Sequence, residues 1–161
     1  MCFIRNNIII SFILFFCFSA LCTAYFIEYV LGHKPCNLCI IERVPYILAI
    51  LTILLGFLFK GYKKFALLTL SLIFFLASVI SFYHFGIEQG FIEESLVCDL
   101  KINSNVLTKE ALLDQLKQST VSCKDVTFRI FGLTLATINI VISLVLSAIS
   151  FKLFLNNEKN K

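Results

Sequence analysis

The sequence predicts an all-α integral membrane protein, a four-transmembrane-helix bundle with two loops on its outward side. Two observations predict this class. Hydrophobic residues make up 59% of the 161 residues and charged residues only 15%, whereas about a quarter of the residues in a soluble domain are charged. The apolar residues also gather in four uncharged runs, at 6–27, 44–59, 65–87 and 130–151.

Each run suits a transmembrane helix. A helix needs roughly 20 residues to cross the hydrocarbon core, and the uniformly apolar runs do not alternate as barrel strands do. The first run is longer than the apolar part of a signal peptide, which indicates a retained anchor. We expect one membrane domain over 1–161. Its spans are expected at about 8–29, 40–59, 65–86 and 130–152, with outward loops at about 30–39 and 87–129.

Charge predicts the orientation of these spans. The side with both termini and the "KGYKK" turn has seven basic residues and one acid, a net charge of +6. The other side has seven basic residues and nine acids, a net charge of −2. Because basic residues in short loops favour the cytoplasm, both termini should be cytoplasmic. The overall charge of +4 is therefore a topology signal and gives no support for nucleic-acid binding.

The second outward loop contains "TKEALLDQLKQ" at 108–118. Thr108 is a suitable N-cap, and Leu112, Leu113 and Leu116 share one helical face. This pattern predicts a short amphipathic helix. It could lie on the membrane surface or pack on its own loop, and the sequence does not decide between the two.

Four of the seven cysteines fall on the outward side, where an oxidising compartment would preserve disulfides. Cys2 falls on the cytoplasmic side, and we expect Cys17 and Cys22, inside the first span, to act as small apolar side chains. The outward cysteines are Cys36, Cys39, Cys98 and Cys123.

The stretch "KPCNLCIIERVPY" places a C-x-x-C at the start of the second span. A helix N-terminus and a nearby cation both favour a thiolate. If the helix already includes Cys39, then Arg43 lies one turn further on the same face. Pro45 leaves a second arrangement open, since it would kink such a helix or start a new one. Either way, we predict a reactive Cys39 at the water–lipid boundary with Arg43 near it.

Structural roles are the alternatives for these residues. Cys36 and Cys39 could form a static disulfide, and Arg43 could be an interface anchor. A Cys98–Cys123 bond would brace the second loop by about 3–4 kcal/mol. A Cys₄ zinc site is a further alternative, ranked low because the compartment is oxidising; no metal is predicted.

The motifs "PCNLCIIERVPY", "YHFGIEQG" and "CKDVTFRIFGLTLATIN" make nearly the whole chain similar to the disulfide bond formation protein B (DsbB) family. The chain departs from that pattern in having no Trp and in Thr127-Phe128 before Arg129. The resemblance implies a bacterial inner-membrane oxidase. It would reoxidise a periplasmic DsbA-like thioredoxin-fold protein and pass the electrons to a membrane quinone, ubiquinone or menaquinone.

The resemblance also implies roles for single residues. Cys98 would carry the mixed disulfide with the partner, and Cys123 would pass the electrons to Cys36 through an interloop disulfide. Cys39 would face the quinone beside Arg43, and His84 matches a family histidine near the quinone. Two other functions stay open: a membrane carrier of thiol reductant, and a non-enzymatic scaffold held by disulfides or zinc.

Overall fold

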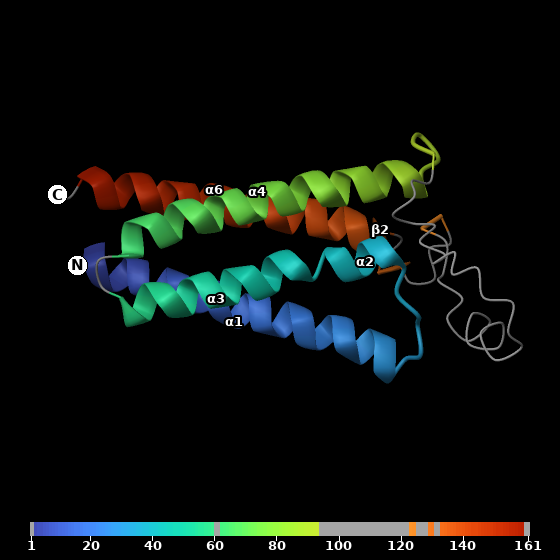
Figure 1. Cartoon of the computed structure of the whole chain (residues 1–161), viewed down its shortest axis with the longest axis horizontal. Coiled ribbons are helices and arrows are strands. Elements are labelled where there is room, and N and C mark those ends of the chain that lie inside the picture. Colours follow the sequence, from blue (N-terminus) through green and yellow to red (C-terminus); the bar gives the residue numbers. More distant parts are fainter. Residues whose placement is uncertain (1, 60–61, 94–122, 125–128, 131–132, 160–161) are drawn as a thin grey trace, which may run out of the picture.

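The computed structural model describes residues 2–59, 62–93, 123–124, 129–130 and 133–159. Four of its helices are long and apolar enough to cross a membrane. They run side by side, and both chain termini lie at the end of the bundle opposite α2 (Figure 1). The predicted all-α membrane fold is therefore confirmed. The amphipathic helix expected at 108–118 lies outside the described residues.

The helices and strands follow the apolar runs of the sequence, with differences at two of the span starts. The elements are α1 (Cys2–Tyr29), α2 (Asn37–Ile41), α3 (Val44–Leu58), α4 (Lys63–Glu88), β1 (Arg129–Ile130), β2 (Leu133–Thr134) and α6 (Leu135–Lys159).

The second span is divided into α2 and α3 by Pro45. Pro45 lies in the first turn of α3, where its missing N–H costs no hydrogen bond. In one continuous helix its ring would collide with the carbonyl group of Ile41, four residues earlier. The chain therefore ends α2 at Ile41, and Glu42 and Arg43 connect it to α3.

The fourth span begins later than residue 130 because a small hairpin precedes it. β1 pairs antiparallel with β2, with Arg129 opposite Thr134 and Ile130 opposite Leu133. The Thr134 hydroxyl then accepts a hydrogen bond from the backbone N–H of Thr137 at 3.2 Å. This is an N-cap interaction, and it fits the start of α6 at Leu135.

The bundle packs as a series in which α1 contacts α3, α3 contacts α4, and α4 contacts α6 most extensively. Small polar residues allow the close approach of α4 and α6, as is common between helices in lipid. The Ser71 hydroxyl donates to the Ser147 carbonyl oxygen at 3.2 Å, and the Ser147 hydroxyl donates to the Ser71 carbonyl oxygen at 3.0 Å. This reciprocal pair fixes the two helices against each other.

The apolar core lies between α1, α3, α4 and α6, mostly toward the end that carries the termini. Phe74 is fully buried there, and its ring meets Tyr46 edge-on with centroids 6.1 Å apart. Ile13, Cys17 and Leu70 belong to the same cluster. Most other apolar side chains of the spans face outward, as lipid contact requires, since only 17–39% of each span is buried.

We predict that Phe74→Ala lowers the free energy of unfolding by about 3 kcal/mol or more, because it leaves a cavity in this core. Phe75→Ala is the matched control, since the Phe75 ring is 52% exposed toward the lipid side. Reversible unfolding in mixed micelles with increasing dodecyl sulfate measures both. Equal losses for the two variants would contradict the described packing.

Candidate active site

The two cysteines of the C-x-x-C lie at the start of the short helix α2. Cys36 is its N-cap in an extended conformation, and its sulfur accepts a hydrogen bond from the backbone N–H of Cys39 at 3.2 Å. Cys39 lies one turn further, with the two Cα atoms 5.2 Å apart, and the sulfurs are joined as a disulfide. The local fold of α2 thus brings the two sulfurs together.

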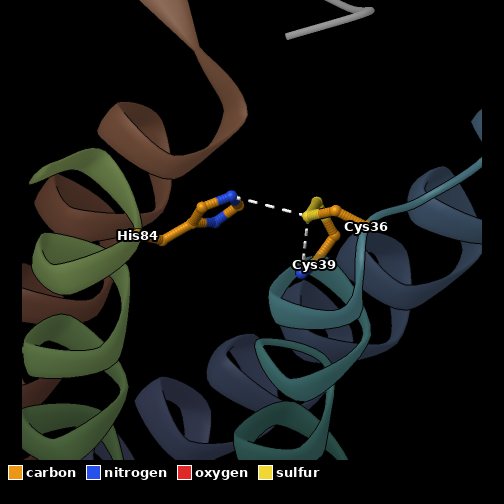
Figure 2. A group of neighbouring side chains, drawn as sticks. All are labelled: Cys36, Cys39 and His84. Atoms are coloured by element: carbon orange, nitrogen blue, oxygen red, sulfur yellow. Dashed lines mark hydrogen bonds between the residues drawn. A yellow bond between two sulfur atoms is a disulfide. The ribbon is translucent and has the colours of Figure 1, made fainter. Parts of the chain in front are cut away.

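His84 approaches this disulfide from α4 (Figure 2). Its Nε2 atom lies 3.5 Å from the sulfur of Cys36, and the side chain is only 3% exposed. A histidine at this distance can exchange a proton with the sulfur when the disulfide opens. His84 therefore contacts the disulfide from outside α2.

The other ring nitrogen of His84 is held by a buried polar network. Nδ1 lies 3.0 Å from Oε1 of Glu42. The second carboxylate oxygen, Oε2, accepts from the side-chain amide of Asn139 at 3.3 Å. The same amide donates to the Ser81 hydroxyl at 2.8 Å, and the Tyr46 hydroxyl donates to the Asn139 carbonyl oxygen. The network therefore orients the imidazole from α3, α4 and α6 together.

Arg43 points away from this network, toward α1. Its guanidinium donates to Oε2 of Glu28 at 2.5 Å, and its Cζ atom lies 4.9 Å from the centre of the Tyr25 ring. The break in the helix before Pro45 means that Cys39 and Arg43 do not share one continuous helix. Arg43 and Cys39 nevertheless line the same cavity.

A cavity of about 400 Å³ connects these groups. This volume is within the range of small-molecule sites, which are mostly apolar with a few polar groups. Its apolar walls come from α1 and α6. These are the first and last helices in the order α1, α3, α4, α6 in which neighbouring helices pack most closely. Its polar and sulfur-containing lining residues include Glu28, Cys36, Cys39, Glu42, Arg43, His84, Glu88, Cys123 and Asn139.

Cys123 reaches the same end of the bundle from the second loop. It is 3% exposed and disulfide-bonded, and it packs in a cluster with Cys36, Leu38 and Ile87. Cys98 lies outside the described residues. Among the residues expected to be functional, the structure thus brings Cys36, Cys39, Arg43, His84 and Cys123 to one cavity.

Three acids and one amide that line the cavity were not predicted as functional residues. They are Glu28, Glu42, Glu88 and Asn139. A polar side chain inside an apolar run was the available signal for Asn139. Glu88 follows His84 by four residues, the spacing of neighbours on one helical face.

The fold and the site together define a multi-pass membrane protein with a thiol–disulfide centre at one end of its bundle. A family model described as "Disulfide bond formation protein DsbB" matches residues 6–153. The chain therefore belongs to the DsbB family, as its motifs predicted. This membership indicates an oxidoreductase that acts in disulfide bond formation at a membrane.

A relative with a similar sequence occurs in Rickettsia prowazekii (strain Madrid E). The uncharacterized protein RP370 is 26% identical over 129 residues, which cover 79% of this chain and 75% of the relative. No solved structure matches the chain. The name of this relative states no activity. The functional class therefore rests on the family match.

We predict that Asn139→Ala lowers the free energy of unfolding by about 1–3 kcal/mol, because it leaves a Glu42 oxygen and the Tyr46 hydroxyl without their partner. A double-mutant cycle with Glu42→Ala tests whether the loss comes from this contact. The loss of unfolding free energy in the double variant should be smaller than the sum of the two single losses by at least about 0.5 kcal/mol. Strictly additive losses, measured in the same micelle assay, would contradict the network.

Proposed function

We propose that this chain is a membrane thiol oxidase that reoxidises a periplasmic DsbA-like thioredoxin-fold protein and delivers the electrons to a membrane quinone. The observation that carries the proposal is the Cys36–Cys39 disulfide, which lies against buried His84 on the wall of a largely apolar cavity. A static disulfide has no need of such a cavity. The family match supports the same reaction class.

The reaction is a series of disulfide exchanges followed by loss of two electrons. The partner's thiolate attacks Cys98 of a Cys98–Cys123 disulfide, and the freed Cys123 thiolate attacks Cys36. This breaks the Cys36–Cys39 bond and leaves Cys39 as a thiolate. The partner's second thiol then displaces Cys98, so the partner leaves as a disulfide. The Cys98 thiolate attacks Cys123 of the Cys36–Cys123 bond, which restores the Cys98–Cys123 disulfide and releases Cys36. The Cys36–Cys39 dithiol then gives two electrons and two protons to the quinone and forms its own disulfide again. Cys123 is packed in one cluster with Cys36, which supports the second exchange.

The residues of the cavity suit a quinone as the electron acceptor. A quinone supplies an acceptor for two electrons and two protons, in a molecule that dissolves in lipid. The apolar walls from α1 and α6 suit its ring and tail, and Arg43 offers a permanent cation near a developing negative charge. DsbA-type partners have a reduction potential of about −120 mV, so an acceptor about 100 mV higher provides 4–5 kcal/mol.

His84 and Glu42 handle the protons in this proposal. With Nδ1 hydrogen-bonded to Glu42, the Nε2 atom faces the Cys36 sulfur at 3.5 Å. It is therefore placed to give a proton to Cys36 when that sulfur leaves, and to take one back when the disulfide forms again. The Asn139 amide keeps Glu42 in position for this role.

The proposed orientation places both termini in the cytoplasm and the redox cysteines on the periplasmic side of a bacterial inner membrane. The two ends of α4 test it, because Tyr62 is 58% exposed at one end and Phe91 is 84% exposed just beyond the other. We predict that Phe91→Cys, in a background without other cysteines, reacts with a membrane-impermeant maleimide in intact spheroplasts. Tyr62→Cys should react only after permeabilisation, and the reverse pattern would refute the orientation.

We predict that Cys39→Ser abolishes quinone reduction, because the electron pair then has no sulfur from which to leave. Cys98→Ser should instead prevent the mixed disulfide with the reduced partner, seen on a non-reducing gel. Cys22→Ser is the matched control, since Cys22 is a free thiol on the exposed side of α1. Quinol formation is followed by absorbance. Unchanged partner reoxidation in Cys39→Ser or Cys98→Ser would remove the proposal.

A further inference from the structure

The site contains a buried acid that the proposed electron transfer does not use. The side chain of Glu88 is only 6% exposed, and its Oε1 atom lies 3.7 Å from Nε2 of His84. Its other oxygen, Oε2, is buried and has no hydrogen-bond partner among the described residues. A buried carboxylate without a donor is costly unless a cation completes its surroundings.

Two sulfurs and the imidazole beside Glu88 form a set that a thiophilic metal ion would bind. The sulfurs of Cys36 and Cys39 and a ring nitrogen of His84 all lie within 4.8 Å of one another. Glu88 is outside this set of three and approaches it at His84. In a tetrahedral zinc site with Zn–S near 2.3 Å and Zn–N near 2.0 Å, neighbouring ligand atoms are about 3.3–3.8 Å apart. The observed separations of 3.5 Å from Nε2 to the Cys36 sulfur and 3.7 Å from Nε2 to Oε1 of Glu88 fall in that range.

The outer surroundings of His84 are also those of a metal ligand. A histidine that binds a metal through one nitrogen usually hydrogen-bonds a carboxylate through the other, which fixes the ring and its tautomer. Glu42 occupies this place at 3.0 Å from Nδ1. The backbone N–H of Cys39 also points at the Cys36 sulfur, where it would stabilise a bound thiolate.

We propose that the reduced form of this site binds one Zn²⁺ ion through Cys36, Cys39, Nε2 of His84 and Glu88. The ligand set differs from the Cys₄ site considered from the sequence, and the proposal goes beyond the oxidase function. In the oxidised form the two sulfurs are bonded to each other and are not available as thiolates. Two electrons from a dithiol must first open the disulfide, and zinc binding then releases the two thiol protons.

Metal binding and electron transfer therefore compete for the same reduced sulfurs. While an acceptor removes the electrons, the disulfide reforms and the metal site disappears. When no acceptor is present, Zn²⁺ would hold the thiolates and protect them from other oxidants. The site would thus be a metal site that exists only in the reduced state.

The test uses the full-length protein in micelles with Cys98→Ser and Cys123→Ser, so that the second redox pair cannot bind the metal. The protein is reduced with a phosphine, freed of reductant and titrated with Co²⁺ as a spectroscopic probe. We expect one equivalent bound, with the absorption of a tetrahedral ion and sulfur-to-cobalt charge transfer, and displacement by Zn²⁺. The oxidised protein should give no such spectrum.

Two carboxamide variants decide whether Glu88 is a ligand. Glu88→Gln should weaken Co²⁺ and Zn²⁺ binding by roughly tenfold or more. Glu93→Gln, the same change at an exposed acid five residues further on, should leave the affinity unchanged. No binding to the reduced protein, equal effects of the two variants, or a full signal that survives Cys36→Ser would each overturn the proposal.

The proposed oxidase function is tested separately by measuring quinone reduction with metal-free protein that retains all its cysteines. Normal quinone reduction without a cobalt spectrum would refute the metal site alone. A normal cobalt titration without quinone reduction would refute the oxidase function alone.

Discussion

The position of every group in the site depends on how the Glu42 carboxylate is satisfied inside the bundle. A buried acid at the edge of a membrane is stable only with partners that use its oxygens. Glu42 is 9% exposed, and its two oxygens meet His84 from α4 and Asn139 from α6. These contacts fix the junction of α2 and α3 against both helices. The sulfurs are held one turn before that junction, so they share its position.

Two neighbouring residues at the junction of α2 and α3 serve different sides of the site. Glu42 turns into the network of α4 and α6, while Arg43 reaches Glu28 and Tyr25 on α1. The cavity lies between these two directions, with the disulfide on its wall.

The sequence was sufficient for the fold and for part of the site, because these depend on local patterns. The length of the apolar runs identified the four spans, and the C-x-x-C at a span start located the two cysteines that the structure joins. The contact of Asn139 with Glu42 joins residues 97 positions apart, so no local pattern could indicate it. The hairpin before α6 was also missed, since its strands are apolar enough to extend the fourth run.

The balance of charge in this site disfavours thiolates on its reduced cysteines. Arg43 is already paired with Glu28, and Lys34, which also lines the cavity, is exposed. Glu42 and Glu88 therefore share one buried histidine even before any sulfur becomes anionic. Adding thiolates to this low-dielectric region raises its energy unless they take up protons, charge leaves or a cation enters. In the proposed oxidase function, the loss of two electrons with reformation of the disulfide would remove the charge. In the proposed metal site, a bound divalent ion would supply the cation. The same buried acids are thus consistent with both proposals.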